Sequence, residues 1–197
     1  MTFYRRNLPH WQPEGESIFL TWRLYGSLPR GTGTPACVPS PGRQFVLVDR
    51  LFDAASSGPL WLKEPHIAQQ VVAAIHRGAT DLNQYKLHAY VVMPNHVHLL
   101  ISPQIPVSRI TKGLKGITAR AANQFLHRTG QPFWLDESYD HWVRNTKQFH
   151  RITEYIENNP VTAGLVSHAE DWPWSSAQSR QISQARVPVP RRIQAHA

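Results

Sequence analysis

Four segments of the chain carry the pattern of hydrophobic and polar positions that is typical of β-strands. Residues 17–26, SIFLTWRLYG, are rich in β-branched and aromatic side chains. Residues 85–93 and 96–102 are two further runs of this kind, and the Pro-Asn pair between them predicts a hairpin. Residues 138–144, SYDHWVR, indicate a short fourth strand. The chain therefore supplies four candidate strands for one sheet.

Three other segments repeat their apolar residues at helical spacing. In residues 63–78 the apolar side chains recur every four positions, and Pro65 suits the first turn of a helix. Residues 107–130 form the longest candidate helix, with a continuous apolar stripe and a basic opposite side. Residues 145–160 predict a further helix that stops at Pro160.

The order of these elements predicts the fold class. Strand, helix, strand, strand, helix, strand is the split βαβ, ferredoxin-like order, an α+β fold whose central antiparallel sheet carries helices on one face, and an extra C-terminal helix follows. We expect one domain over residues 1–177, interrupted by a Pro/Gly-rich excursion at about 27–42. Residues 178–197 form a basic tail that we expect to be flexible.

The charge balance adds an expectation about partners. The 197 residues include 21 Lys and Arg but only 13 Asp and Glu, for a net charge of +8. This excess favours a polyanionic partner, nucleic acid first and an anionic membrane surface second, although a cationic surface also serves solubility alone. No apolar run approaches the roughly 18–20 residues of a membrane span, and the first residues lack the apolar core of a secretory signal. Cys37 is the single cysteine, which excludes an internal disulfide framework. We therefore expect a cytoplasmic protein with no membrane partner.

Two histidines stand out in the most apolar stretch of the chain, VVMPNHVHLLI at residues 91–101. Side chains alternate along a strand, so His96 and His98 project from one face while Val97 and Leu99 point to the other. A lone histidine on a strand is more often a packed polar residue than a metal ligand, but two in this register can converge on one ion. No cysteine is nearby, so oxygen ligands and a hard ion such as Mg²⁺ or Mn²⁺ would complete such a site.

Tyr155, in ITEYIENNP, is the second candidate for chemistry. It borders the apolar stripe of its predicted helix, and Asn159 follows one turn later on the same helical face. An amphipathic tyrosine packed on the sheet, and an asparagine that ends the helix before Pro160, would explain these residues without any chemistry. Spacing alone leaves both interpretations open.

Several motifs together resemble a known family. YVVMPNHVHLLISP, DHWVRNTKQFHRITEYIENNPVTAGLV and DWPWSSA are similar to segments of the single-tyrosine transposases whose signature is His-hydrophobe-His, and most of all to the branch called REP-associated tyrosine transposases. The similarity runs from about Tyr4 to Ala177 and includes FLTWRLYGSLP and GPLWLKEPHIAQQVVAAI. This resemblance implies the same ferredoxin-like fold and, as partners, single-stranded DNA hairpins of repeated extragenic palindromes. It implies a monomer, although insertion-sequence relatives of this branch form dimers.

The resemblance also implies roles for four residues. His96 and His98 match the two metal-binding histidines, and Tyr155 matches the nucleophile. Asn159 occupies the place of a polar third metal ligand. The implied activity is a metal-dependent cleavage and rejoining of single-stranded DNA through a 5′-phosphotyrosine, with Mg²⁺ or Mn²⁺ as cofactor.

Basic side chains spread along the chain are candidates for phosphate contacts, which give affinity and salt dependence but little sequence information. Each one taken singly is more often a solvated surface charge. The candidates are Arg5, Arg6, Arg109, Lys112, Lys115, Arg120, Arg144 and Lys147. The group that accepts the proton of the tyrosine is open between His141 and His150.

Two other functions stay open. A ferredoxin-like domain can bind single-stranded nucleic acid on its sheet without any catalysis. A metal-dependent phosphatase would use the histidine pair but would leave Tyr155 without a role. A pure binding module would not need His96, His98, Tyr155 and Asn159 together, so the complete set favours the transposase.

Overall fold

The computed structural model describes residues 2–5, 9–12, 16–27 and 58–178. Most of the predicted Pro/Gly-rich excursion, Arg6 and the tail beyond Gln178 lie outside these residues. Within the described part of the chain, no helix combines the length and the apolar character that a membrane crossing requires.

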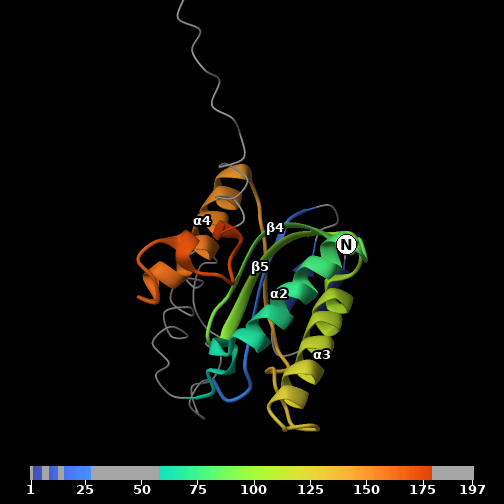
Figure 1. The fold of residues 1–197 in the computed structure, drawn as a ribbon. Coiled ribbons are helices and arrows are strands. Elements are labelled where there is room, and N and C mark those ends of the chain that lie inside the picture. Colours follow the sequence, from blue (N-terminus) through green and yellow to red (C-terminus); the bar gives the residue numbers. More distant parts are fainter. Residues whose placement is uncertain (1, 6–8, 13–15, 28–57, 179–197) are drawn as a thin grey trace, which may run out of the picture.

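The central sheet has four antiparallel strands in the order β4-β5-β3-β6 (Figure 1). Their bounds are Ile18–Arg23 for β3, Tyr85–Val92 for β4, His96–Pro103 for β5 and Tyr139–Trp142 for β6. Each strand corresponds to a predicted one, and β4 and β5 form the predicted hairpin. Because β5 lies between β3 and β4, the order is that of the split βαβ, and the predicted α+β fold is confirmed.

A small N-terminal hairpin was not predicted. It pairs β1 (Thr2–Arg5) with β2 (Pro9–Gln12) as a separate two-stranded sheet. Their sequences, TFYR and PHWQ, show no alternation of apolar and polar positions. Two short 3₁₀ helices, η1 (Trp61–Lys63) and η2 (Ala169–Asp171), complete the described elements.

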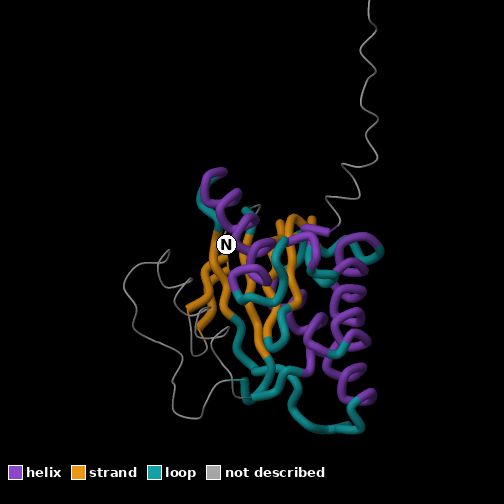
Figure 2. Tube along the Cα trace, turned by 60° about the vertical axis from the view of Figure 1, so that its left-hand side comes forward, coloured by secondary structure: helices purple, strands orange, loops and turns teal. Residues whose placement is uncertain are grey.

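Helices cover both faces of the central sheet. Helices α2 (Pro65–Thr80) and α3 (Val107–Phe125) lie side by side on one face, as predicted, and α4 (Thr146–Thr162) lies on the other (Figures 1 and 2). The sheet is therefore the middle layer of the molecule, and α4 is the extra helix that carries Tyr155.

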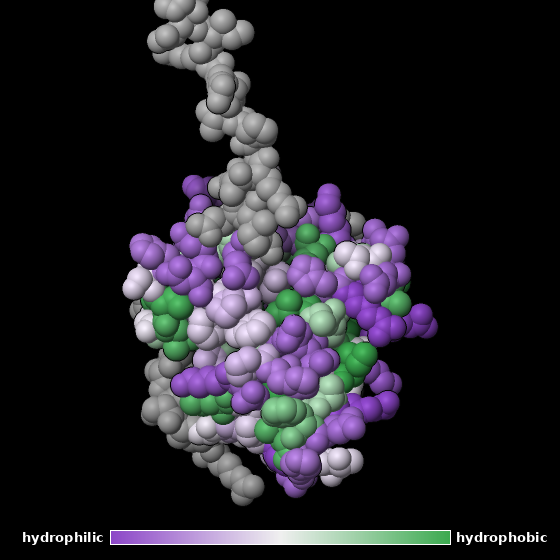
Figure 3. Space-filling model, viewed as in Figure 1, coloured by the Kyte–Doolittle hydropathy of each residue, from purple (hydrophilic) through white to green (hydrophobic). Residues whose placement is uncertain are grey.

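The alternation of side chains along β3 produces two separate cores. Leu20 and Trp22 belong to the core beneath α2 and α3, whereas Phe19 packs with Ile152 and Ile156 of α4. The large apolar side chains that remain exposed are spread over several parts of the chain, and Figure 3 shows separate green patches among purple residues on the face that it views.

The ends of two helices differ from the prediction. Helix α4 does not stop at Pro160 but continues to Thr162, and the Ala163 N–H beyond the proline donates to the Asn159 carbonyl at 2.9 Å. The predicted helix 107–130 ends at Phe125 instead. His127 follows with a left-handed φ of 55°, so the chain turns away before Gly130.

The segment after α4 fastens that helix to the sheet. The indole Nε1 of Trp172 donates to the carbonyl of Val92 at 3.0 Å, and the Val92 N–H donates to the carbonyl of Trp174 at 2.8 Å. Ser176 Oγ donates to the buried carboxylate of Glu157 at 2.9 Å. The DWPWSS motif is thus a packing element that fixes α4 against the edge strand β4.

Candidate active site

The histidine pair lies at the start of β5, on the sheet face that α4 covers. Both imidazoles are fully buried, with 0% of their surface exposed. The Nε2 atoms of His96 and His98 are 3.1 Å apart. The two rings therefore converge through the same nitrogen, as the shared strand face predicts.

The other ring nitrogen of each histidine is held by a neighbour. Asn95 Oδ1 lies 2.6 Å from His96 Nδ1, and because an amide oxygen can only accept, His96 Nδ1 carries the proton and Nε2 presents its lone pair. Thr21 Oγ1 lies 2.7 Å from His98 Nδ1. When this hydroxyl accepts, His98 Nε2 also presents a lone pair toward His96, an arrangement that a cation bound by both nitrogens would stabilise.

Helix α4 brings Tyr155 and Asn159 to the histidines. The rings of Tyr155 and His98 have centroids 5.7 Å apart. Asn159 is buried, and its Nδ2 donates to the Tyr155 hydroxyl oxygen at 3.3 Å. Because the helix continues through Pro160, both residues stay on one helical face. The structure therefore brings together all four residues that the sequence singled out for chemistry.

The donor set fits a divalent ion if the amide takes part. In the described ranges no group of three His, Cys, Asp or Glu side chains could hold a metal ion. An ion at the two imidazoles would thus need the oxygen of Asn159, or water, as a further ligand, and such oxygen ligands suit Mg²⁺ and Mn²⁺.

Thr21 and Asn95 were missed by the sequence analysis. Asn95 adjoins the histidines in the chain, but Thr21 is 77 positions away from His98 and reaches it through strand pairing. The available signal was Thr21, the single polar residue in the apolar run IFLTW.

His141 and His150, the two candidates for proton acceptor, lie differently. Burial, and the positive charge of Arg144, lower the pKa of His141, while Asp140 raises it in part. Its ring is stacked on Tyr139 at 6.5 Å, and its Nε2 lies 2.7 Å from Gln148 Nε2. The exposed His150 contacts the ring of Phe149. These contacts do not support either residue as the proton acceptor of Tyr155.

Aromatic rings lie beside both His98 and His141. Phe19 is the cross-strand partner of His141, and its ring centroid is 5.4 Å from that of His98 and 6.5 Å from that of Tyr139. Burial, and the nearby charge of Asp140, raise the pKa of Tyr139 to about 12, so this phenol stays protonated at neutral pH. Phe19 and Tyr139 are therefore aromatic neighbours of the site on the side of β6.

Five of the eight predicted phosphate-binding residues are exposed and lie in two groups on opposite sides of the sheet. Arg144 and Lys147 are exposed around the start of α4, on the side of the histidine pair. Arg109, Lys112 and Arg120 are exposed on α3, on the other side. Arg5 is the last residue of β1, and Arg6 lies outside the described residues.

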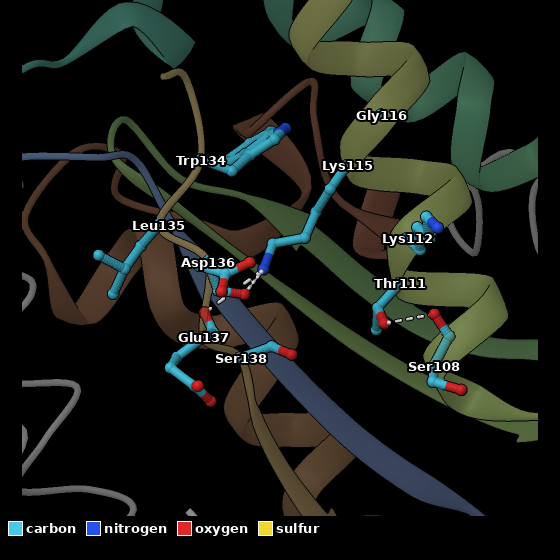
Figure 4. A pocket seen from close by; sticks show the side chains of 10 residues that line it. All are labelled: Ser108, Thr111, Lys112, Lys115, Gly116, Trp134, Leu135, Asp136, Glu137 and Ser138. Atoms are coloured by element: carbon cyan, nitrogen blue, oxygen red, sulfur yellow. Dashed lines mark hydrogen bonds between the residues drawn. The ribbon is translucent and has the colours of Figure 1, made fainter. Parts of the chain in front are cut away.

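Lys115 has a structural contact of its own. Its Nζ donates to the backbone carbonyls of Asp136 and Glu137 at 2.8 and 3.4 Å (Figure 4). It thereby joins α3 to the segment before β6 across a pocket of about 620 Å³, whose lining includes Lys112 and Ser138. A phosphate contact by Lys115 would compete with these two hydrogen bonds.

Comparison with known proteins identifies a family for this chain. A family model described as "Transposase IS200 like" matches residues 61–159, a segment that contains the histidine pair, Tyr155 and Asn159. The REP-associated tyrosine transposase of Escherichia coli (strain K12) is 28% identical over 109 residues, which are 53% of this chain and 61% of that protein. The chain thus spans less than two thirds of the length of this curated relative.

A solved structure has the same fold. It is described as a REP-associated tyrosine transposase bound to a REP hairpin. The match covers 95% of this chain and 89% of that chain, with a TM-score of 0.59. Because the sequence identity is 20%, this likeness concerns the arrangement of helices and strands.

Proposed function

The chain belongs to the IS200-like transposase family, and from this premise we propose that it cleaves and rejoins single-stranded DNA with Tyr155 as nucleophile. The observation that carries the proposal is the convergence of two imidazole Nε2 atoms, 3.1 Å apart, beside a tyrosine that an adjacent amide contacts. A module that only binds DNA has no need for this buried polar cluster.

The proposed reaction is a transesterification at phosphorus. The Tyr155 oxygen forms a bond to the phosphorus while the bond to the 3′ oxygen breaks, so that one strand leaves with a 3′-hydroxyl and the other stays attached as a 5′-phosphotyrosine. The phenol loses its proton and the leaving oxygen gains one. Attack by another 3′-hydroxyl reverses the step and joins strands without an external energy source.

The chain's own residues would support this step in two ways. Asn159 donates to the phenolic oxygen through Nδ2, which stabilises negative charge as it develops there. His96, His98 and the Asn159 oxygen would hold a divalent ion, Mg²⁺ or Mn²⁺. Such an ion, when bound, supplies positive charge next to the phosphate.

The two groups of exposed cations suggest how DNA would lie. Arg144 and Lys147 would contact phosphates next to the cleaved bond, because they share the side of α4. Arg109, Lys112 and Arg120 would contact phosphates farther along, on the outer side of α3. We propose single-stranded hairpins of repeated extragenic palindromes as the substrate, bound by a monomer.

An adduct assay tests the proposed function. End-labelled single-stranded hairpins from repeats that flank the gene are mixed with the protein and Mn²⁺ or Mg²⁺, and a denaturing gel reports covalent protein–DNA species. We expect an adduct with the unmodified protein and none with Tyr155→Phe or His96→Ala. Tyr25→Phe is the matched control, because Tyr25 is 47% exposed in the turn after β3, and its adduct should be unchanged.

Two results would contradict the proposal. DNA binding without an adduct, with both metals and several hairpins, would favour the non-catalytic binding module. An adduct that persists in Tyr155→Phe would place the nucleophile elsewhere.

A further inference from the structure

The pocket between α3 and the segment that leads into β6 has no part in the chemistry proposed for Tyr155 (Figure 4). Its volume is about 620 Å³, which is within the range of pockets that bind small organic groups. One wall is formed by the exposed positions Ser108, Lys112 and Gly116 of α3. The other wall is the segment 134–138.

The sheet connects this pocket to the histidine pair. The Leu135 N–H donates to the Arg23 carbonyl at 2.9 Å, and Arg23 is paired with His96 across β3 and β5. The backbone of the pocket wall is therefore two strand spacings, about 10 Å, from that of His96. The histidines face α4 and the pocket lies beside α3, so a DNA strand held at both would pass over the sheet edge at 134–138. A stacked strand advances about 3.4 Å per nucleotide, so about six nucleotides cover this path.

The hydrogen-bonding groups of the pocket divide into two sets. Those of Thr111 and Trp134 serve the protein, because Thr111 Oγ1 donates to the Val107 carbonyl and Trp134 Nε1 donates to Thr118 Oγ1. The other set has no hydrogen-bond partner within residues 58–178 and consists of the Ser108 hydroxyl, the Ser138 hydroxyl and the Lys112 ammonium. A hydroxyl can both donate and accept, as the polar edge of a nucleobase requires.

The charges of the lining favour a base over a phosphate. The lining contains two lysines, Lys112 and Lys115, and two acids, Asp136 and Glu137, so its formal net charge is zero. Lys115, Asp136 and Glu137 also have interactions within the protein. A phosphate gains little from a lining without net charge. An uncharged, flat group with donors and acceptors at its edge suits the two free hydroxyls and the apolar surface of the Trp134 ring.

We propose that this pocket binds one unpaired nucleobase of the single-stranded substrate, within about six nucleotides of the phosphate attacked by Tyr155. The inference rests on the proposed function and deepens it, because a bound base would contribute to the choice of the cleaved sequence. Ser108 and Ser138 would contact the edge of the base. Lys112, at the exposed rim, would contact the phosphate that follows it.

The first experiment fills the pocket. A Cβ at Gly116 would meet nothing within 4 Å, and the same holds for Gly113, which is also exposed on α3 but is not part of the lining. Gly116→Leu should therefore occupy the pocket without a clash, and Gly113→Leu is the matched control. Fluorescence anisotropy measures the affinity for a single-stranded hairpin in the Tyr155→Phe background, which lacks the proposed nucleophile. Loss of one bound base should weaken binding about tenfold for Gly116→Leu and less than about threefold for Gly113→Leu.

The second experiment asks whether a base, and not the DNA backbone, occupies the pocket. Single abasic sites are placed in turn at each of about six nucleotides on either side of the cleaved phosphate. One position should bind about tenfold more weakly to the Gly113→Leu protein when its base is missing. For Gly116→Leu the same abasic site should change the affinity by less than about threefold, because the pocket is already filled. Thermal unfolding of both variants checks that they are equally folded.

The outcomes separate this inference from the proposed function. Equal affinities of Gly116→Leu and Gly113→Leu, the lack of any sensitive abasic position, or an equal abasic loss in both variants would overturn the base pocket alone. In the last case, leucine at position 116 would merely obstruct the DNA backbone. An adduct assay without product would overturn the proposed cleavage, whereas the affinity measurements, which need no cleavage, would still decide on the pocket. A protein that binds no single-stranded DNA would overturn both.

Discussion

On the sheet face beneath α2 and α3, strand β5 presents Val97 and Leu99 to a mainly apolar core, whereas on the face beneath α4 it presents His96 and His98. Neighbouring residues of one strand thus serve packing on one side and chemistry on the other. The apolar side holds the backbone of β5 in place, and this explains how two imidazoles can be kept 3.1 Å apart. Substitutions only one residue apart in β5 should therefore change either stability or activity, but not both.

His98→Ala should abolish most of the activity while leaving the packing on the other face of β5 unchanged. Loss of a proposed metal ligand removes several kcal/mol of transition-state stabilisation, so adduct formation should fall on the order of 10³-fold. The adduct assay measures the rate, and circular dichroism checks that the fold is retained. A fall of less than about tenfold, with the fold retained, would contradict a role of His98 in catalysis.

Leu99→Ala should lower the stability of the protein, because it removes packing on the opposite face of β5. Leu99 is fully buried, and truncation of a buried leucine to alanine costs about 2–5 kcal/mol in the free energy of unfolding. Urea unfolding measures this cost. The adduct rate per folded molecule should stay the same at low temperature, and a rate that falls further than the folded fraction would show that the two faces are not independent.

Asn95→Ala and Thr21→Val should weaken metal binding at the histidine pair. Both side chains orient a histidine through Nδ1, and loss of such an outer partner lowers metal affinity by about 10–100-fold. Titration with Mn²⁺ followed by electron paramagnetic resonance measures the affinity. Asn158→Ala is the control, because Asn158 is exposed and its amide bonds only within α4. Affinities equal to that of the control would mean that the two contacts are incidental.

Substitution of two glycines by alanine should have opposite effects on stability, one on the outer side of α3 and one in the core. A Cβ at Gly113 would meet nothing within 4 Å, so Gly113→Ala should stabilise the protein by about 0.5–1 kcal/mol through helix propensity. A Cβ at Gly78 of α2 would clash with the Tyr85 ring, so Gly78→Ala should destabilise it. Chemical denaturation measures both. A destabilising Gly113→Ala would show that a neighbour packs on this side of α3.

The elements that could be predicted are those whose apolar residues repeat at a regular spacing. The long apolar repeats of α2, α3 and α4 and the β4–β5 hairpin were all recognisable in the sequence. Strands β1 and β2, with the sequences TFYR and PHWQ, show no apolar and polar alternation and were missed, and the ends of α3 and α4 were misplaced. Gly130 and Pro160 are common where helices end, but the positive φ of His127 and the helical turn through Pro160 depend on packing around them.

The candidate site was predicted in part for the same reason. His96 and His98 share a strand face by alternation, and Tyr155 and Asn159 share a helix face by their spacing of four. Their roles at a metal ion and in DNA cleavage rest on the family and stay proposals.

The sequence by itself determined the order of the elements and which side chains share a face, because both follow from repeats of two and of about 3.6 residues within one segment. Only the tertiary structure decided that α4 covers the face opposite α2 and α3. It also decided that Thr21 reaches His98 across 77 positions and that Arg23 pairs with His96. Such contacts depend on the register between strands far apart in the chain, and that register is selected by packing of the whole core, which no local pattern contains.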